Sequence, residues 1–165
     1  MSAAGVEIEK VRMGEFLVRE PPARLAIYGL GSCVAVFVYE TERRIAALAH
    51  ILLPAPLAGT PRGPAGKYAD TAVAAILGMI LEMGGRREAL IAKVAGGAHM
   101  FSATPSADRE TLGERNIRAA LEAVKRHGLE VAGMDIGGAY GRTIVADVET
   151  GTLTITSLKR EPKEI

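Results

Sequence analysis

The sequence predicts an α+β fold, in which a mixed β-sheet sandwich is packed with two main helices. Three observations predict it. Strand patterns outnumber helix patterns along the 165 residues, the two helix patterns are separated by a strand pattern, and strands and helices do not alternate throughout. A chain of this length can bury a core without disulfides or metals, so one domain over residues 1–165 is expected.

Four strand patterns open the chain. They cover residues 6–13, which alternate, residues 24–30 after a Pro-Pro turn, and the apolar segments 33–40 and 44–53. Both faces of residues 33–39 are apolar, so this strand is expected to be covered on both sides. The polar segment 40–43 is predicted to be a four-residue hairpin loop.

Helix and strand signals follow in the second half. Asp70 offers an N-cap for a helix over about 71–83, which is apolar all round and therefore either deeply buried or used by a partner. A strand over 89–97 precedes a second helix over about 113–127, with Gly128 as its stop. Two or three more strands are expected, over 129–138, 142–149 and 152–158, and the last two are expected to form a hairpin.

The composition argues against several classes of function. Lys plus Arg number 20 and Asp plus Glu 19, and there are no Trp and only 4 Tyr and 3 Phe, so no nucleic-acid partner is expected. The start of the chain lacks a secretory signal, and the longest apolar run, 72–81, is shorter than the ~20 residues that span a bilayer. We expect a cytoplasmic protein with no membrane insertion, no metal site and no cofactor.

Cys33 is the only cysteine in the chain, and it is either a buried packing residue or a nucleophile. Of the three histidines, His127 ends a helix and His99 lies in a loop without a predicted position. If Tyr39 faces Arg44 across the hairpin, paired residue numbers sum to 83 and Cys33 lies directly opposite His50, close enough for a thiolate–imidazole pair. A slip of one residue would put the two side chains on opposite faces.

The glycine-rich segment before Cys33 adds a second element. Gly31 and Ser32 allow a tight turn and present backbone N–H groups near the thiol, where they could bind an oxyanion. The segment has no third glycine for a dinucleotide site and no GK[ST] for a P-loop.

Six short motifs occur in order: GLGSCVAV, AHILLP, GKYADTAV, AGGAHMF, GERN and DIGG…GR. Together they resemble the chemoreceptor glutamine deamidase family, CheD, from about residue 11 to residue 158. The resemblance implies a cysteine-hydrolase fold shared with bacterial toxin deamidases. It also implies an amidohydrolase that converts selected glutamines of the cytoplasmic helices of methyl-accepting chemotaxis receptors to glutamate.

The resemblance also implies roles for individual residues. The nucleophile of the family maps onto Cys33 and its general base onto His50. The third catalytic residue of the family is a threonine six positions before the cysteine, and here that position is Ile27, which has no hydrogen-bonding group. A backbone carbonyl or another hydroxyl, Ser32 being the nearest in sequence, takes that role, or the enzyme is slow; a threonine restored at position 27 is expected to raise activity about tenfold.

The family resemblance further implies a protein partner, a CheC-type phosphatase that acts on phosphorylated CheY. The apolar helix over 71–83 and the Gly/Pro-rich segment before it could contribute to that contact. The alternative to a deamidase is therefore a weakly active or non-catalytic adaptor for this phosphatase, in which Cys33 is residual.

Overall fold

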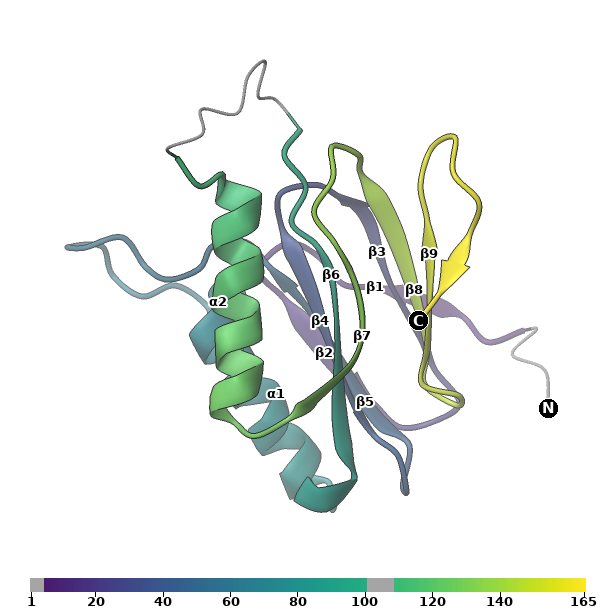
Figure 1. Ribbon diagram of the computed structural model, residues 1–165. Helices are drawn as coiled ribbons and strands as arrows, with labels where there is room; N and C mark the ends of the chain where they lie inside the picture. The colour runs from purple at the N-terminus through teal and green to yellow at the C-terminus, as the bar shows by residue number, and fades with distance from the viewer. Residues whose placement is uncertain (1–4, 101–108) are drawn as a thin grey trace.

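The computed structural model describes residues 5–100 and 109–165, and it contains ten β-strands and two α-helices (Figure 1). The strands are β1 (Ile8–Lys10), β2 (Phe16–Arg19), β3 (Arg24–Leu30), β4 (Val34–Glu40), β5 (Ile45–Ile51), β6 (Leu90–Gly96), β7 (Glu130–Ile136), β8 (Arg142–Asp147), β9 (Thr152–Thr156) and β10 (Lys163–Glu164). The helices are α1 (Ala69–Glu82) and α2 (Leu112–Arg126), and short 3-10 helices cover Ala65–Lys67 and Arg87–Ala89.

The strands form two five-stranded sheets. The outer sheet has the order β1-β3-β8-β9-β10 and the middle sheet the order β2-β5-β4-β6-β7. Each sheet is mixed, since β1 pairs with β3 and β6 with β7 in parallel while the other pairs are antiparallel. The predicted α+β class, with mixed sheets and two main helices, is confirmed; a fold shared with toxin deamidases stays a prediction.

The molecule has three layers, with both helices against one face of the middle sheet and the outer sheet against the other (Figure 1). One apolar cluster joins the helices to the middle sheet through residues such as Val36, Ile76 and Val124. A second cluster, here called the inter-sheet core, includes Phe37, Leu48 and Ile144. Every residue of β4 and β5 is buried, as the two apolar faces of residues 33–39 predict.

The helices begin slightly earlier than predicted. Asp70 is not the N-cap of α1 but lies in its first turn, where its carboxylate accepts the N–H of Thr71; the N-cap is Tyr68. Helix α2 begins with a capping box, in which the Thr111 hydroxyl accepts the N–H of Glu114 and the Glu114 carboxylate accepts the N–H of Thr111. The predicted stop at Gly128 is confirmed by its positive φ of 74°.

The register of the β4–β5 hairpin differs from the prediction. Glu40 pairs with Ile45 and Ala35 with His50, so paired numbers sum to 85 rather than 83. Glu40 stays in the strand because its buried carboxylate accepts the backbone N–H of Arg43 at 2.6 Å, and Arg44, with a φ of 60°, closes the loop. The loop therefore covers residues 41–44, one position later than predicted.

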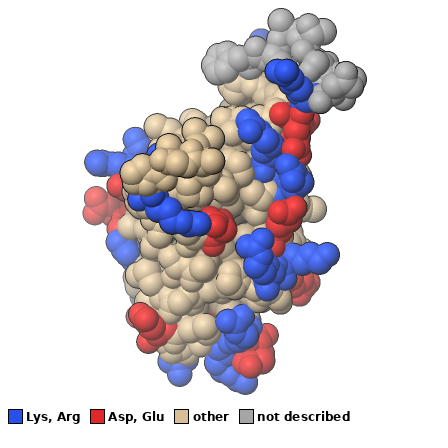
Figure 2. All heavy atoms as spheres, turned by 90° about the vertical axis from the view of Figure 1, so that its left-hand side faces the viewer, with Lys and Arg blue, Asp and Glu red and all other residues tan. Residues whose placement is uncertain are grey.

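Two short strands, β2 and β10, lie at sheet edges and were not predicted. On the helical face of the molecule, Lys and Arg are interspersed with Asp and Glu around a surface of uncharged residues, drawn in tan (Figure 2). Within residues 5–100 and 109–165, no helix is long and apolar enough to cross a membrane.

Candidate active site

The segment between β3 and β4, residues 31–33, carries Cys33 directly before the buried strand β4. Backbone hydrogen bonds hold it against the end of β6: Gly97 donates to the carbonyl of Cys33 at 2.8 Å, and Ala98 to that of Gly31 at 3.0 Å. Gly96 has a φ of 106°, and a Cβ there would lie 2.5 Å from the carbonyl oxygen of Cys33. Glycine at position 96, the last residue of β6, is therefore needed for this close approach.

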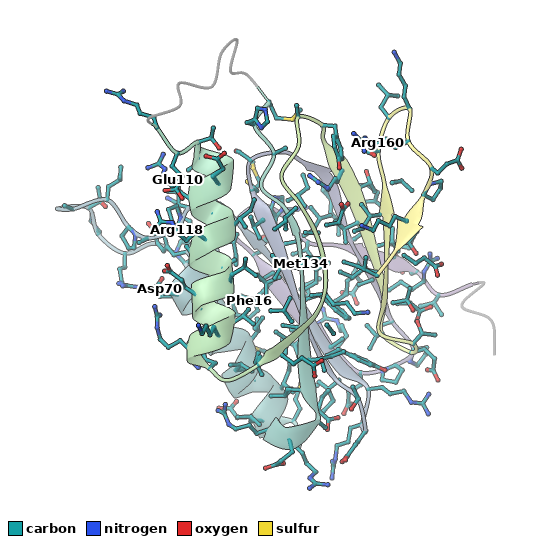
Figure 3. All side chains as sticks on the ribbon, in the orientation of Figure 1. Phe16, Asp70, Glu110, Arg118, Met134 and Arg160 are labelled. Atoms are coloured by element: carbon teal, nitrogen blue, oxygen red, sulfur yellow. The ribbon has the colours of Figure 1, made fainter. Side chains whose placement is uncertain are left out.

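The N-terminus of α2 covers the same place. A Cβ on Gly113 would lie 2.3 Å from the carbonyl oxygen of Gly97 and 2.5 Å from that of Ala98, so only glycine lets the helix pack this closely. Glu110, which is labelled in Figure 3, lies just before the start of this helix. A cavity of about 590 Å³ opens between the helix and the segment; its lining residues are Gly29, Gly31, Ser32, Cys33, Ala98, His99, Met100, Thr111, Leu112 and Gly113.

Cys33 lines this cavity and is 8% exposed. Burial raises the pKa of the Cys33 thiol, and the backbone N–H of Cys33 itself lowers it by less. The thiol is therefore protonated at neutral pH, and a nucleophilic role would require a base that takes its proton.

His50 lies on the same face of the middle sheet as Cys33. Ala46 and Leu48 of β5 face the inter-sheet core, as do Cys33 and Ala35, and His50 continues the alternation of β5. Direct opposition, which the sum of 83 predicted, is wrong: the residue opposite His50 is Ala35. Cys33 and His50 are diagonal neighbours, whose Cβ atoms in a regular ladder lie within about 8 Å.

The imidazole of His50 is held by the backbone. Its Nδ1 lies 3.4 Å from the carbonyl oxygen of Val11, and His50 is 5% exposed. Since a carbonyl only accepts, this contact favours the tautomer with the proton on Nδ1, which leaves Nε2 as the basic nitrogen. Burial lowers the pKa of His50 below its ordinary value of 6.5, so the ring is neutral at pH 7 and can take a proton.

The other two histidines are separated by the fold. His99 lines the same cavity as Cys33, and its backbone N–H donates to the carbonyl of Gly138 at 3.0 Å. His127 is the C-cap of α2 and is not among the residues that line the cavity. His99, which the sequence could not place, thus lines the same cavity as Cys33.

The other predicted site residues also lie near the cavity or behind it. Gly31 and Ser32 line it directly. Ile27 is fully buried in β3, pairs with Ile144, and belongs to the inter-sheet core that also includes Cys33. Of the two replacements considered for the family threonine, the backbone carbonyl has a counterpart in Val11, and among the described residues the Ser32 hydroxyl makes no hydrogen bond.

Sequence reasoning missed Asn116. This residue of α2 is fully buried, and its Nδ2 donates to the carbonyl oxygens of Ser32 at 2.9 Å and Leu52 at 3.1 Å. The motif GERN contains it, but no periodicity or spacing connects it to Cys33. A buried polar side chain at an apolar position of the helical stripe Asn116, Ala120, Val124 was the signal that could have found it.

Comparison with protein families identifies the same family that the motifs resemble. The model for CheD, described as CheD chemotactic sensory transduction, matches residues 52–157. That range contains Asn116 and His99 but begins after Cys33 and His50. The motif AGGAHMF lies within it as well, although Phe101 is outside the described residues.

Full-length relatives cover the rest of the chain. A protein of Symbiobacterium thermophilum named probable chemoreceptor glutamine deamidase CheD is 39% identical over 96% of this chain and 97% of the relative. A protein of the same name from Methanococcus vannielii is 44% identical over 88% of this chain and 92% of the relative. The chemoreceptor glutamine deamidase CheD of Halalkalibacterium halodurans is 37% identical over 96% of this chain and 99% of the relative.

Among solved structures, the hypothetical protein YfiH of Bacillus licheniformis is similar with a TM-score of 0.44 and 15% identity. The match covers 81% of this chain and 59% of that chain. A likeness at this level says nothing about activity.

Proposed function

The chain belongs to the CheD family, and from that premise we propose that it is a protein-glutamine deamidase that acts on chemotaxis receptors. The observation that carries the proposal is the position of Cys33, which lines a cavity of about 590 Å³ while His50 shares its face of the sheet. The relatives' names supply the substrate class, the glutamine side chains of a chemoreceptor. The proposed place of action is the cytoplasm.

The reaction is an acyl transfer in two halves. His50 takes the proton of the Cys33 thiol through Nε2 as the sulfur attacks the carboxamide carbon, which gives a tetrahedral oxyanion. The proton then passes to the departing nitrogen, ammonia leaves, and a thioester remains on Cys33. Water attacks the thioester with His50 as base, and glutamate and the free thiol are released.

The charge that develops on the oxyanion needs donors. The backbone N–H of Cys33 lowers the pKa of its own thiol, and it is the first candidate for such a donor. The segment of Gly31 and Ser32 lines the same cavity and supplies further backbone N–H groups. The N-terminus of α2, with Gly113 and Leu112 at the cavity wall, adds the positive end of the helix dipole.

A neutral thiol beside a neutral imidazole suits this mechanism. Burial raises the pKa of Cys33 and lowers that of His50, so the ion pair is disfavoured until substrate arrives. Attack and proton transfer then occur together, and the thiol stays protected from unspecific reaction while the cavity is empty.

The second candidate function is an adaptor for a CheC-type phosphatase with little activity of its own. Two observations favour it: the raised pKa of Cys33, and the apolar Ile27 in place of the family threonine. Neither requires it, because the carbonyl of Val11 is available to orient His50.

Ammonia release separates the two functions. Purified protein is incubated with a cytoplasmic receptor fragment, with Cys33→Ala as the control, and ammonia is measured together with the mass of the fragment. A deamidase releases one ammonia for each glutamine converted, and Cys33→Ala releases none. Absence of conversion by the folded wild-type protein, with retained binding to the phosphatase, would establish the adaptor.

A further inference from the structure

The β4–β5 ladder ends next to the proposed catalytic pair. Its last pair is Val34 with Ile51, and beyond it the neighbouring segments hold the two strands from opposite sides. Leu52 and Leu53 both donate their N–H groups to the carbonyl of Lys67, while the loop of Cys33 is bonded to the end of β6. Something has to fix the separation of the strands at this point if Cys33 and His50 are to keep their geometry.

The side chain of Asn116 spans this gap. Its Nδ2 donates to the carbonyl of Ser32 at 2.9 Å and to the carbonyl of Leu52 at 3.1 Å. Ser32 immediately precedes the nucleophile, and Leu52 follows the proposed base by two residues. Both partners are carbonyl oxygens, which only accept, so the side-chain nitrogen with its two hydrogens has to face them. The side-chain amide of Asn116 thus links the two strands where the next backbone pair, after Val34 and Ile51, would stand.

From this geometry we propose that Asn116 is a positioning residue, which clamps the backbone before Cys33 to the backbone after His50. It does not touch the reacting atoms; it acts through the separation of the two strands. The catalytic part of the inference rests on the proposed deamidase function, and the mechanical part does not.

The environment of Asn116 supports a functional rather than a purely stabilising role. The residue is fully buried, yet its Oδ1 has no hydrogen-bond partner among the described residues. An unsatisfied buried acceptor is unfavourable for folding. The adjacent positions of the same buried stripe, Ala120 and Val124, are apolar and show what packing against the sheet requires. The two hydrogen bonds that Nδ2 donates explain why an asparagine is present here although its Oδ1 has no partner.

The test compares Asn116→Ala with Val124→Ala. Both positions are fully buried on one stripe of α2, so both variants lose packing, but only the first loses the clamp. Two quantities are measured: kcat and KM for deamidation of a receptor fragment, and the pH profile of Cys33 alkylation by iodoacetamide. We expect Asn116→Ala to lower kcat by about ten- to a hundredfold with KM changed less than about twofold, and to shift the alkylation profile. Val124→Ala should keep wild-type values of both.

The outcomes are separable. If the wild-type protein releases no ammonia, the deamidase proposal fails, and the alkylation profiles alone decide whether Asn116 positions Cys33. Equal kcat and equal alkylation profiles in the two variants overturn the inference. Should Asn116→Ala not fold, Asn116→Asp keeps the shape and replaces the donor by an acceptor. If neither folds while Val124→Ala does, Asn116 serves the fold alone and the inference is wrong.

Discussion

At the scale of single residues, burial decides the chemistry around Cys33. The sequence favoured a thiolate stabilised by an adjacent histidine, but the thiol is 8% exposed and its pKa is raised. Two histidines are candidates for the base: His50 is held by the carbonyl of Val11 on the same face, and His99 lines the same cavity. The diagonal relation of His50 to Cys33 and its lowered pKa favour His50 as the group that takes the proton.

Replacement of each histidine by alanine tests this assignment. His50→Ala should lower kcat for receptor deamidation by at least about a hundredfold, because it removes the general base. His99→Ala should change kcat by less than about tenfold, since His99 lines the cavity but is not the proposed base. Steady-state assays on both variants, with folding checked by circular dichroism, give the comparison; a larger loss in His99→Ala would reverse the roles.

Ile27→Thr tests what replaces the family threonine. The sequence alone predicts a gain of about tenfold, but Nδ1 of His50 already faces the carbonyl of Val11, and Ile27 is fully buried in the inter-sheet core. We therefore expect kcat to stay within about twofold and the free energy of unfolding to fall by about 1–3 kcal/mol, because a hydroxyl is buried in place of the ethyl branch of isoleucine.

Urea unfolding and the deamidation assay measure the two quantities, and Ile27→Val is the matched control that shortens the side chain without adding a hydroxyl. A tenfold gain in kcat for Ile27→Thr but not for Ile27→Val would show that the carbonyl of Val11 does not orient the ring.

At the scale of elements, close backbone approaches build the cavity, and glycines permit them. Helix α2 reaches the loop after β6 only because Gly113 has no side chain: a Cβ would lie 2.3 Å and 2.5 Å from two carbonyl oxygens. Gly78 in α1 is the contrasting case, since a Cβ there meets nothing within 4 Å. One helix glycine is thus a structural requirement and the other is not.

Glycine-to-alanine substitution in the two helices should have opposite effects. Gly78→Ala should raise the free energy of unfolding by about 0.5–1 kcal/mol through helix propensity. Gly113→Ala should lower it by about 1–3 kcal/mol and reduce kcat, because the N-terminus of α2 has to move away from the cavity. Denaturant unfolding of both variants checks the signs, and a stabilising Gly113→Ala would contradict the observed contact.

The sequence predicted elements better than their contacts. Periodicity located both helices and most strands within two or three residues, because apolar spacing reflects burial directly. It missed β2 and β10, which are short edge strands with little pattern of their own. The β4–β5 register was off by one residue on each strand, since the burial of Glu40 and the positive φ of Arg44 depend on tertiary contacts. Cys33 and His50 still lie on the same face of the sheet, because the sum of paired residue numbers changed by two and side chains alternate with a period of two.

At the scale of the whole molecule, the middle sheet lies between the helices and the outer sheet, and the site opens where all three layers meet (Figure 1). The division of the strands into two sheets, and the hydrogen bonds of Asn116 to Ser32 and Leu52, could not be predicted, because they depend on contacts between residues far apart in sequence. The buried face of α1 settles one alternative: Val73, Ile76 and Ile80 pack on the middle sheet. Only the solvent-facing side of α1 is left for contact with a partner protein.

Met79 is a large apolar residue of α1 that is exposed, with 41% of its surface accessible. Met79→Glu should therefore leave the free energy of unfolding unchanged within about 0.5 kcal/mol. Binding to a CheC-type phosphatase should weaken by at least about tenfold if this side of α1 contributes to the contact. Calorimetric titration measures the binding, with Glu82→Gln as a control on the same helix. Undiminished binding would place the partner surface elsewhere.

The central claim is that Cys33 forms a covalent acyl intermediate with a receptor glutamine. Acid quench of the enzyme during turnover of a receptor fragment, followed by mass spectrometry of the segment that contains Cys33, tests it most directly. We expect an adduct of the fragment on Cys33, lighter than the sum of the two by one ammonia, which hydroxylamine cleaves and which is absent in Cys33→Ala. Turnover without an adduct, with full deamidation by Cys33→Ala, would contradict it.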